Sequence, residues 1–254
     1  MKKEKLMNKS IEKTINILIY CLLIPGVMLL GYLLWKNKNF NIVSMGIALL
    51  TCIPFFINFE RKKYGAKELV TISIMVSISA MGRLLFALTP GFKPVTAITI
   101  LSAIAFGPQV GFMTGSLSAL VSNIYFGQGP WTAFQMFSWG ILGYISGLMF
   151  RRNKNPNIIL LILIGILGGV LFSLIMDLYS TLSLGSGFSF KRYIAIIITA
   201  LPFTGIYVVS NVVFLIALYK PILKVLNRMK SKYGVFQDLD KGVNKLETEI
   251  FQEL

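Results

Sequence analysis

Two charged side chains lie inside stretches that are otherwise apolar, and they are the first candidates for chemistry. Arg83 and Asp177 each stand a few residues before the end of a long apolar segment. A charge at the centre of a membrane helix costs about 2.5–3.5 kcal/mol on insertion scales, so such a residue usually faces a partner, a water-filled cavity or the headgroups. Either both side chains extend to the interface, or they face a polar cavity in which they could pair.

A second candidate is the polar and aromatic stretch that follows residues 127–130. Gly, Gln, Gly and Pro at these positions predict a tight, uncharged turn. Trp131, Gln135 and Trp139 then recur every fourth residue, which places them on one face of a helix. Lipid cannot satisfy the amide of Gln135. Two indole rings beside one hydrogen-bonding group favour contact with an organic ligand, and packing between helices is the alternative.

A third candidate is the segment 89–94, which has two prolines and one glycine and therefore predicts a shaped loop. Lys93 is its only charge, and it faces either a ligand or solvent. The candidate ligand-binding residues are Arg83, Lys93, Asn123, Gln128, Trp131, Gln135, Trp139 and Asp177.

Small residues predict one close helix contact. Ser73 and Ser77 are four residues apart, and Ala80 continues the same face. In lipid, such faces let helix backbones approach one another, within a protein or between proteins.

Several kinds of chemistry are excluded by composition. The chain has no histidine, which rules out His-based catalytic triads, HExxH zinc sites and histidine ligation of haem. Cys21 and Cys52 lie in separate apolar stretches and are interpreted as packing residues that face lipid. No GxxxxGK[ST] phosphate loop occurs, so the chain does not hydrolyse ATP by that route. We predict no catalytic residues, no metal site, no cofactor and no enzyme activity.

The elements that position these residues are apolar helices. Of 254 residues, 55% are apolar and 14% charged, against about 25% charged in a typical soluble domain; mean hydropathy is +0.72. Residues 94–150 contain no Lys, Arg, Asp or Glu. The sequence therefore predicts an all-α, polytopic membrane bundle.

Segment 94–107 spans only about 21 Å at 1.5 Å per residue, so it either crosses fully or forms a re-entrant pair with its neighbour. The predicted segments are 15–35, 40–59, 68–89, 94–107, 109–127, 132–150, 157–180 and 193–219.

The basic charge indicates orientation. The net charge is +15, and with the N-terminus inside, 19 of the 25 Lys and Arg residues fall on the inner side. Cytoplasmic loops carry such an excess. We therefore expect a multi-pass protein of a bacterial plasma membrane with both termini in the cytoplasm, and no nucleic-acid partner.

Six short strings carry a resemblance to a known family. Together they are similar to the substrate-binding (S) components of energy-coupling-factor (ECF) vitamin transporters, and most similar to the branch associated with cobalamin uptake. The strings are GR at 82–83, FKPVTAI at 92–98, FGPQVGF at 106–112, SALVSN at 118–123, FGQGPWT at 126–132 and QMF at 135–137.

The resemblance implies a six-helix core with full spans throughout and an outward-facing vitamin site, with cobalamin as the transported ligand. It also implies partners: a membrane scaffold subunit and two cytoplasmic ATPases, with transport by tipping of the S component in the membrane. The family's scaffold contact is an Ala-xxx-Ala face, whose nearest equivalent here is Ser73 and Ser77, with Ala80 beside them.

The expected domains are a two-helix extension (1–66), the six-helix core (67–220) and a cytoplasmic tail (221–254) with a separate amphipathic helix. The alternatives are a stand-alone secondary carrier that uses Arg83 and Asp177 as a coupled site, an S component for another vitamin or precursor, and a purely structural subunit.

Overall fold

The chain forms a bundle of α-helices, seen here in a computed structural model that describes residues 40–61, 64–151, 156–184 and 188–236. This confirms the predicted fold class. The predicted segment 15–35, with Cys21, lies outside the described residues. The helices are α3 (Phe40–Arg61), α4 (Ala66–Leu85), α5 (Val95–Phe106), α6 (Pro108–Phe126), α7 (Pro130–Met149), α8 (Ile158–Ser183) and α9 (Phe190–Tyr233).

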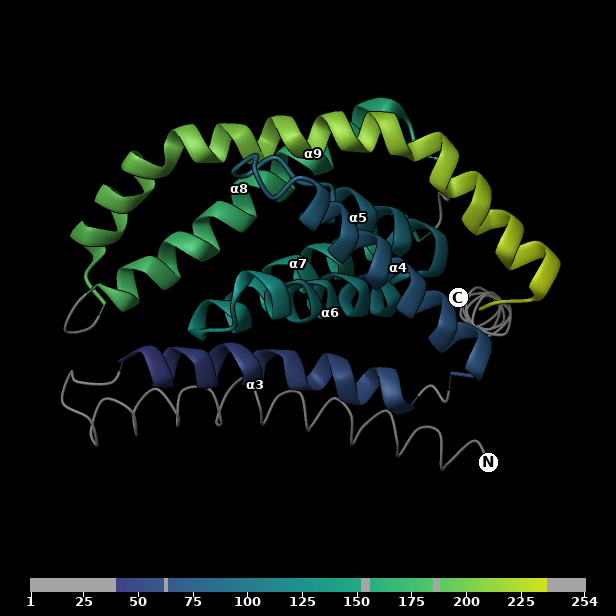
Figure 1. Ribbon diagram of the computed structural model, residues 1–254, viewed down its shortest axis with the longest axis horizontal. Helices are drawn as coiled ribbons and strands as arrows, with labels where there is room; N and C mark the ends of the chain where they lie inside the picture. Colours follow the sequence, from purple (N-terminus) through teal and green to yellow (C-terminus); the bar gives the residue numbers. More distant parts are fainter. Residues whose placement is uncertain (1–39, 62–63, 152–155, 185–187, 237–254) are drawn as a thin grey trace, which may run out of the picture.

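Three of the described helices are long and apolar enough to cross a membrane by length and composition: α4, α8 and α9. Helix α9 runs along one side of the bundle and α3 along the opposite side (Figure 1). Cys52 on α3 is 1% exposed. It therefore packs against protein, and the interpretation that it faces lipid is wrong.

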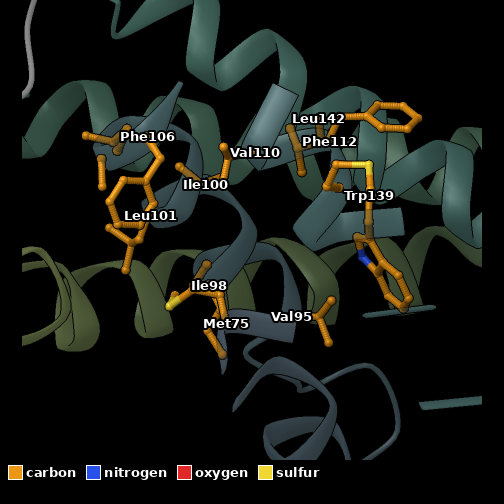
Figure 2. Packing of buried hydrophobic residues seen from close by; sticks show 14 of the residues in the cluster. Met75, Val95, Ile98, Ile100, Leu101, Phe106, Val110, Phe112, Trp139 and Leu142 are labelled. Carbon is orange, nitrogen blue, oxygen red and sulfur yellow. The ribbon is translucent and has the colours of Figure 1, made fainter. Parts of the chain in front are cut away.

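Helix α5 is the centre of the bundle. All of its residues are buried, and α4, α6, α7 and α9 pack around it. Figure 2 shows part of this core, including Ile98 and Leu101 of α5 with Met75 of α4. The helix has 12 residues, a length of about 18 Å, which is less than the roughly 30 Å hydrocarbon core. The full span implied by the family resemblance is therefore not seen; because protein surrounds α5, its ends need not reach the headgroups.

Helices α6 and α7 approach each other closely because glycines face each other across their contact. A Cβ atom added at Gly111 of α6 would lie 2.6 Å from the carbonyl oxygen of Gly143 on α7. Gly147 is likewise in contact with Pro108. Small residues of this kind are typical of membrane helix interfaces. The contact fixes α7, and with it Gln135 and Trp139, relative to the end of α6.

Helix α9 is longer than predicted. The expected break near residue 220 and the separate tail helix are wrong, because α9 continues through Pro221 to Tyr233. Leu223 and Leu226, beyond the proline, are 4% and 2% exposed, and this burial outweighs the hydrogen bond that proline removes. The proposed division into three domains stays a prediction.

Candidate functional site

A cavity of about 90 Å³ lies between α4, α5, α7, α8 and α9. It is smaller than typical small-molecule sites of roughly 300–1,000 Å³. Four of the predicted binding residues line it: Arg83, Lys93, Gln135 and Trp139. The other lining residues are Gly91, Val95, Thr96, Phe172, Tyr207 and Asn211.

Arg83 is held in the last turn of α4 by the end of α6. Its side chain is 7% exposed. Nη1 donates to Ser122 Oγ at 2.6 Å and to Asn123 Oδ1 at 2.7 Å. The guanidinium carbon lies 4.6 Å from the ring centroid of Phe126 and 5.1 Å from that of Trp139. The arginine is therefore buried in protein and does not extend to the interface.

Asn123 connects the arginine to α7. Its Nδ2 donates to Thr132 Oγ1 and to Gln135 Oε1, both at 2.9 Å. Because Gln135 accepts through its oxygen, its Nε2 donors remain for the cavity it lines. Asn123 does not itself line the cavity; it positions the two side chains that do.

Aromatic rings form one wall of the cavity. Trp139 is stacked on Phe172 of α8, with ring centroids 4.9 Å apart and an interplanar angle of 14°. Phe172 meets Tyr207 of α9 edge to face at 5.1 Å. Such flat apolar surfaces suit a planar ring of a ligand.

The loop 86–94 carries Lys93 into the site. The Lys93 N–H donates to Ser210 Oγ at 2.8 Å, and that hydroxyl donates to the Lys93 carbonyl at 3.1 Å. Gly91 has φ of +75° and packs against Ile206 and Tyr207, so a side chain there would be both strained and obstructed. The ammonium of Lys93 lies 4.6 Å from the Phe126 centroid. Burial lowers the pKa of Lys93, and the nearby charge of Arg83 lowers it further.

The cavity lies deeper than the sequence suggests. Trp139 is nine residues from the start of α7, about 14 Å at helical rise, and Tyr207 is seventeen residues into α9, about 26 Å. Arg83 stays in the last turn of α4, as expected, and loop 86–94 folds against α9 through Gly91 and Lys93. The expected cluster at the helix ends therefore extends further along α7 and α9 than the sequence suggests.

Besides Asn123, three other predicted binding residues lie outside the cavity lining. Asp177 accepts from Ser173 Oγ at 3.4 Å, and within the part of the chain that the structure describes it forms no ion pair with Arg83. Gln128 accepts a hydrogen bond from Thr132 and donates one to the Leu120 carbonyl. These two hydrogen bonds stabilise the turn at residues 127–130. Trp131 folds its ring onto Gly129.

The small residues of the expected α4 face differ in exposure. Ser73 and Ser77 are exposed, whereas Ala80 is 5% exposed. At 100° per residue, Ala80 lies about 20° from Ser73 around the helix axis, on the side that turns toward the core. The use of this face as a scaffold contact stays a prediction.

Phe172, Tyr207 and Asn211 were not predicted. Aromatic residues in apolar helices give no signal of their own, because most of them pack in cores or against lipid. Asn211 did give a signal in the sequence, because it is an amide within a long apolar run. In the structure its Nδ2 donates to the Gly165 carbonyl at 3.1 Å.

Comparisons with known proteins identify a family. A family model described as "ECF-type riboflavin transporter, S component" matches residues 34–227, about three quarters of the chain. The description names a transport component and no enzyme.

Curated relatives are similar over a shorter stretch. A UPF0397 protein of Vibrio atlanticus is 33% identical over 97 residues, 36% of this chain and 53% of the relative. UPF0397 proteins of Aliivibrio fischeri and Aliivibrio salmonicida are 33% identical over 96 residues and 34% over 89, covering 36% and 33% of this chain and 52% and 48% of the relatives. The chain thus spans about half the length of these relatives. No solved structure matches significantly.

Proposed function

Because the chain belongs to the family of ECF-type riboflavin transporter S components, we propose that it is the substrate-binding subunit of an ECF importer. It captures a vitamin from outside, and a scaffold subunit with two cytoplasmic ATPases completes transport. Both termini lie in the cytoplasm. The observation that carries this proposal is the cavity in which Arg83, Gln135 and Trp139 converge. A buried arginine in a membrane protein is costly unless it serves a function, and here an amide and an indole ring lie beside it.

The ligand has a flat conjugated ring system. The stacked pair of Trp139 and Phe172 presents a flat aromatic surface beside the cavity, and Gln135 offers hydrogen-bond donors next to it. Two vitamins are the leading candidates. Cobalamin is favoured by the sequence strings, and riboflavin is named in the family description. The small cavity favours the smaller flavin, because the bulky corrinoid requires larger movements of the lining side chains.

The proposal is tested by calorimetry on the purified full-length protein with cobalamin, riboflavin and a panel of other vitamins. We expect one vitamin to bind with a sub-micromolar dissociation constant. Binding of none contradicts the proposal. Ion-driven uptake into liposomes that contain this protein alone contradicts the ATPase-dependent mechanism and favours a secondary carrier.

Trp139→Ala is expected to weaken binding of that vitamin by about 1–3 kcal/mol, or roughly 5- to 150-fold, as for other buried aromatic anchors. The reason is the loss of the ring that faces the cavity. Trp131→Ala is the matched control, because Trp131 is on the same helix outside the cavity lining. Equal dissociation constants for Trp139→Ala and the wild type would assign Trp139 to packing alone.

Ser73→Trp is expected to block association with the scaffold and to leave vitamin affinity intact, because Ser73 is exposed on α4 and far along the helix from Arg83. Co-purification with the scaffold measures the first effect and calorimetry the second. Leu163→Trp is the control, since Leu163 is 49% exposed on a different helix, α8. If both variants retain the scaffold equally, the α4 face is not the contact.

A further inference from the structure

Two positive charges face the cavity, and no carboxylate lines it. Arg83 and Lys93 are the charged residues among the lining side chains. Within the described ranges, neither cation has a carboxylate oxygen within 4 Å. Asp177, the nearby acid, instead accepts from Ser173. The cavity thus carries an uncompensated positive charge inside a protein that sits in lipid.

The two cations contact the same aromatic ring. Both lie 4.6 Å from the centroid of the same ring, Phe126. The π face offsets only part of their charge, and like charges in a low dielectric repel strongly. Burial and the charge of Arg83 both lower the pKa of Lys93, as expected for a cation that lacks an anionic partner.

Both side chains also have free hydrogen-bond donors. Nη1 of Arg83 donates to Ser122 and Asn123, so the N–H groups of Nη2 and Nε remain as donors on the planar guanidinium. Two such parallel N–H groups match the paired oxygens of a phosphate or carboxylate. Lys93 is anchored through its backbone to Ser210, and its ammonium lies over the ring of Phe126 that Arg83 also contacts.

We propose that the site recognises an anionic group of its ligand, a phosphate or a carboxylate, between Arg83 and Lys93. The inference rests on the proposed function and narrows the substrate class: a flat ring lies toward Trp139 and an acidic substituent toward the two cations. A neutral vitamin would leave both charges unpaired. The phosphodiester of cobalamin and the phosphate of a phosphorylated flavin both meet this requirement.

The test uses ligands that differ only in the anion. Riboflavin and riboflavin 5′-phosphate are titrated into the wild type, Lys93→Met and Lys191→Met. We expect the phosphate form to bind the wild type at least about tenfold more tightly, since a charge-assisted contact of 1.4 kcal/mol corresponds to a factor of ten. Lys93→Met should lose this preference. Lys191→Met should keep it, because Lys191 is exposed at the start of α9.

Inorganic phosphate provides a second readout that does not depend on the choice of vitamin. It should raise the thermal unfolding temperature of the wild type more than that of Lys93→Met, at matched ionic strength. If phosphate stabilises in this way but no vitamin binds, the anion site stands and the vitamin proposal fails. If riboflavin and its phosphate bind equally well and inorganic phosphate has no selective effect, the anion site is overturned while the vitamin proposal stands.

Discussion

Arg83→Met is expected to weaken vitamin binding by about 100-fold. Hydrogen bonds to charged groups contribute roughly 1.5–3 kcal/mol, and 3 kcal/mol corresponds to about 150-fold in affinity. The substitution removes the guanidinium from the cavity. It also leaves Asn123 Oδ1 without its 2.7 Å donor, which loosens the amide chain that positions Gln135.

Calorimetry measures this effect, and two further variants interpret it. Arg228→Met is the matched control, because Arg228 is exposed on the distant part of α9. Arg83→Lys keeps the charge but cannot reproduce the planar fork, so its affinity should fall between those of the wild type and Arg83→Met. A folded Arg83→Met protein with wild-type affinity would remove Arg83 from the site.

Gly143→Ala is expected to lower the stability of the bundle by at least about 1–3 kcal/mol, the usual cost of overpacking. The added methyl group would run into the Gly111 backbone, and a backbone cannot rotate away as a side chain can. For a protein of this size, that cost corresponds to a fall in unfolding temperature of about 2–12 °C. Thermal unfolding of the purified protein in detergent measures it.

Gly205→Ala is the control for this stability prediction. Gly205 lies in α9, and an added Cβ would meet nothing within 4 Å. Alanine favours helix over glycine by about 0.5–1 kcal/mol, so this variant should be as stable as the wild type or slightly more stable. Equal unfolding temperatures for the two variants would show that α6 and α7 do not pack through Gly143.

Most of the helical framework could be predicted from the sequence, because apolar runs and the turns between them are local signals. Helices α6 and α7 begin and end close to the predicted segments. The length of α9 could not be predicted, because Pro221 indicates a break by itself. Only the burial of Leu223 and Leu226 against other helices shows why the helix continues.

The part of the site that could be predicted consists of residues whose type is unusual in an apolar segment. Arg83, Lys93, Gln135 and Trp139 were expected and do line one cavity. The partner of Arg83 was not predictable, because several polar groups compete for it; Ser122 and Asn123 are its partners, and Asp177 is not. The contribution of α9 to the cavity was also not predictable, since it depends on how loop 86–94 folds against α9.

The most direct test of the account is an experimental structure of the protein with its vitamin bound. We predict that the ligand occupies the cavity lined by Trp139 and Tyr207, with its polar groups within hydrogen-bond distance of Arg83 and Gln135. A ligand bound on the cytoplasmic side or on a lipid-facing surface, with this cavity still empty, would contradict the central claim.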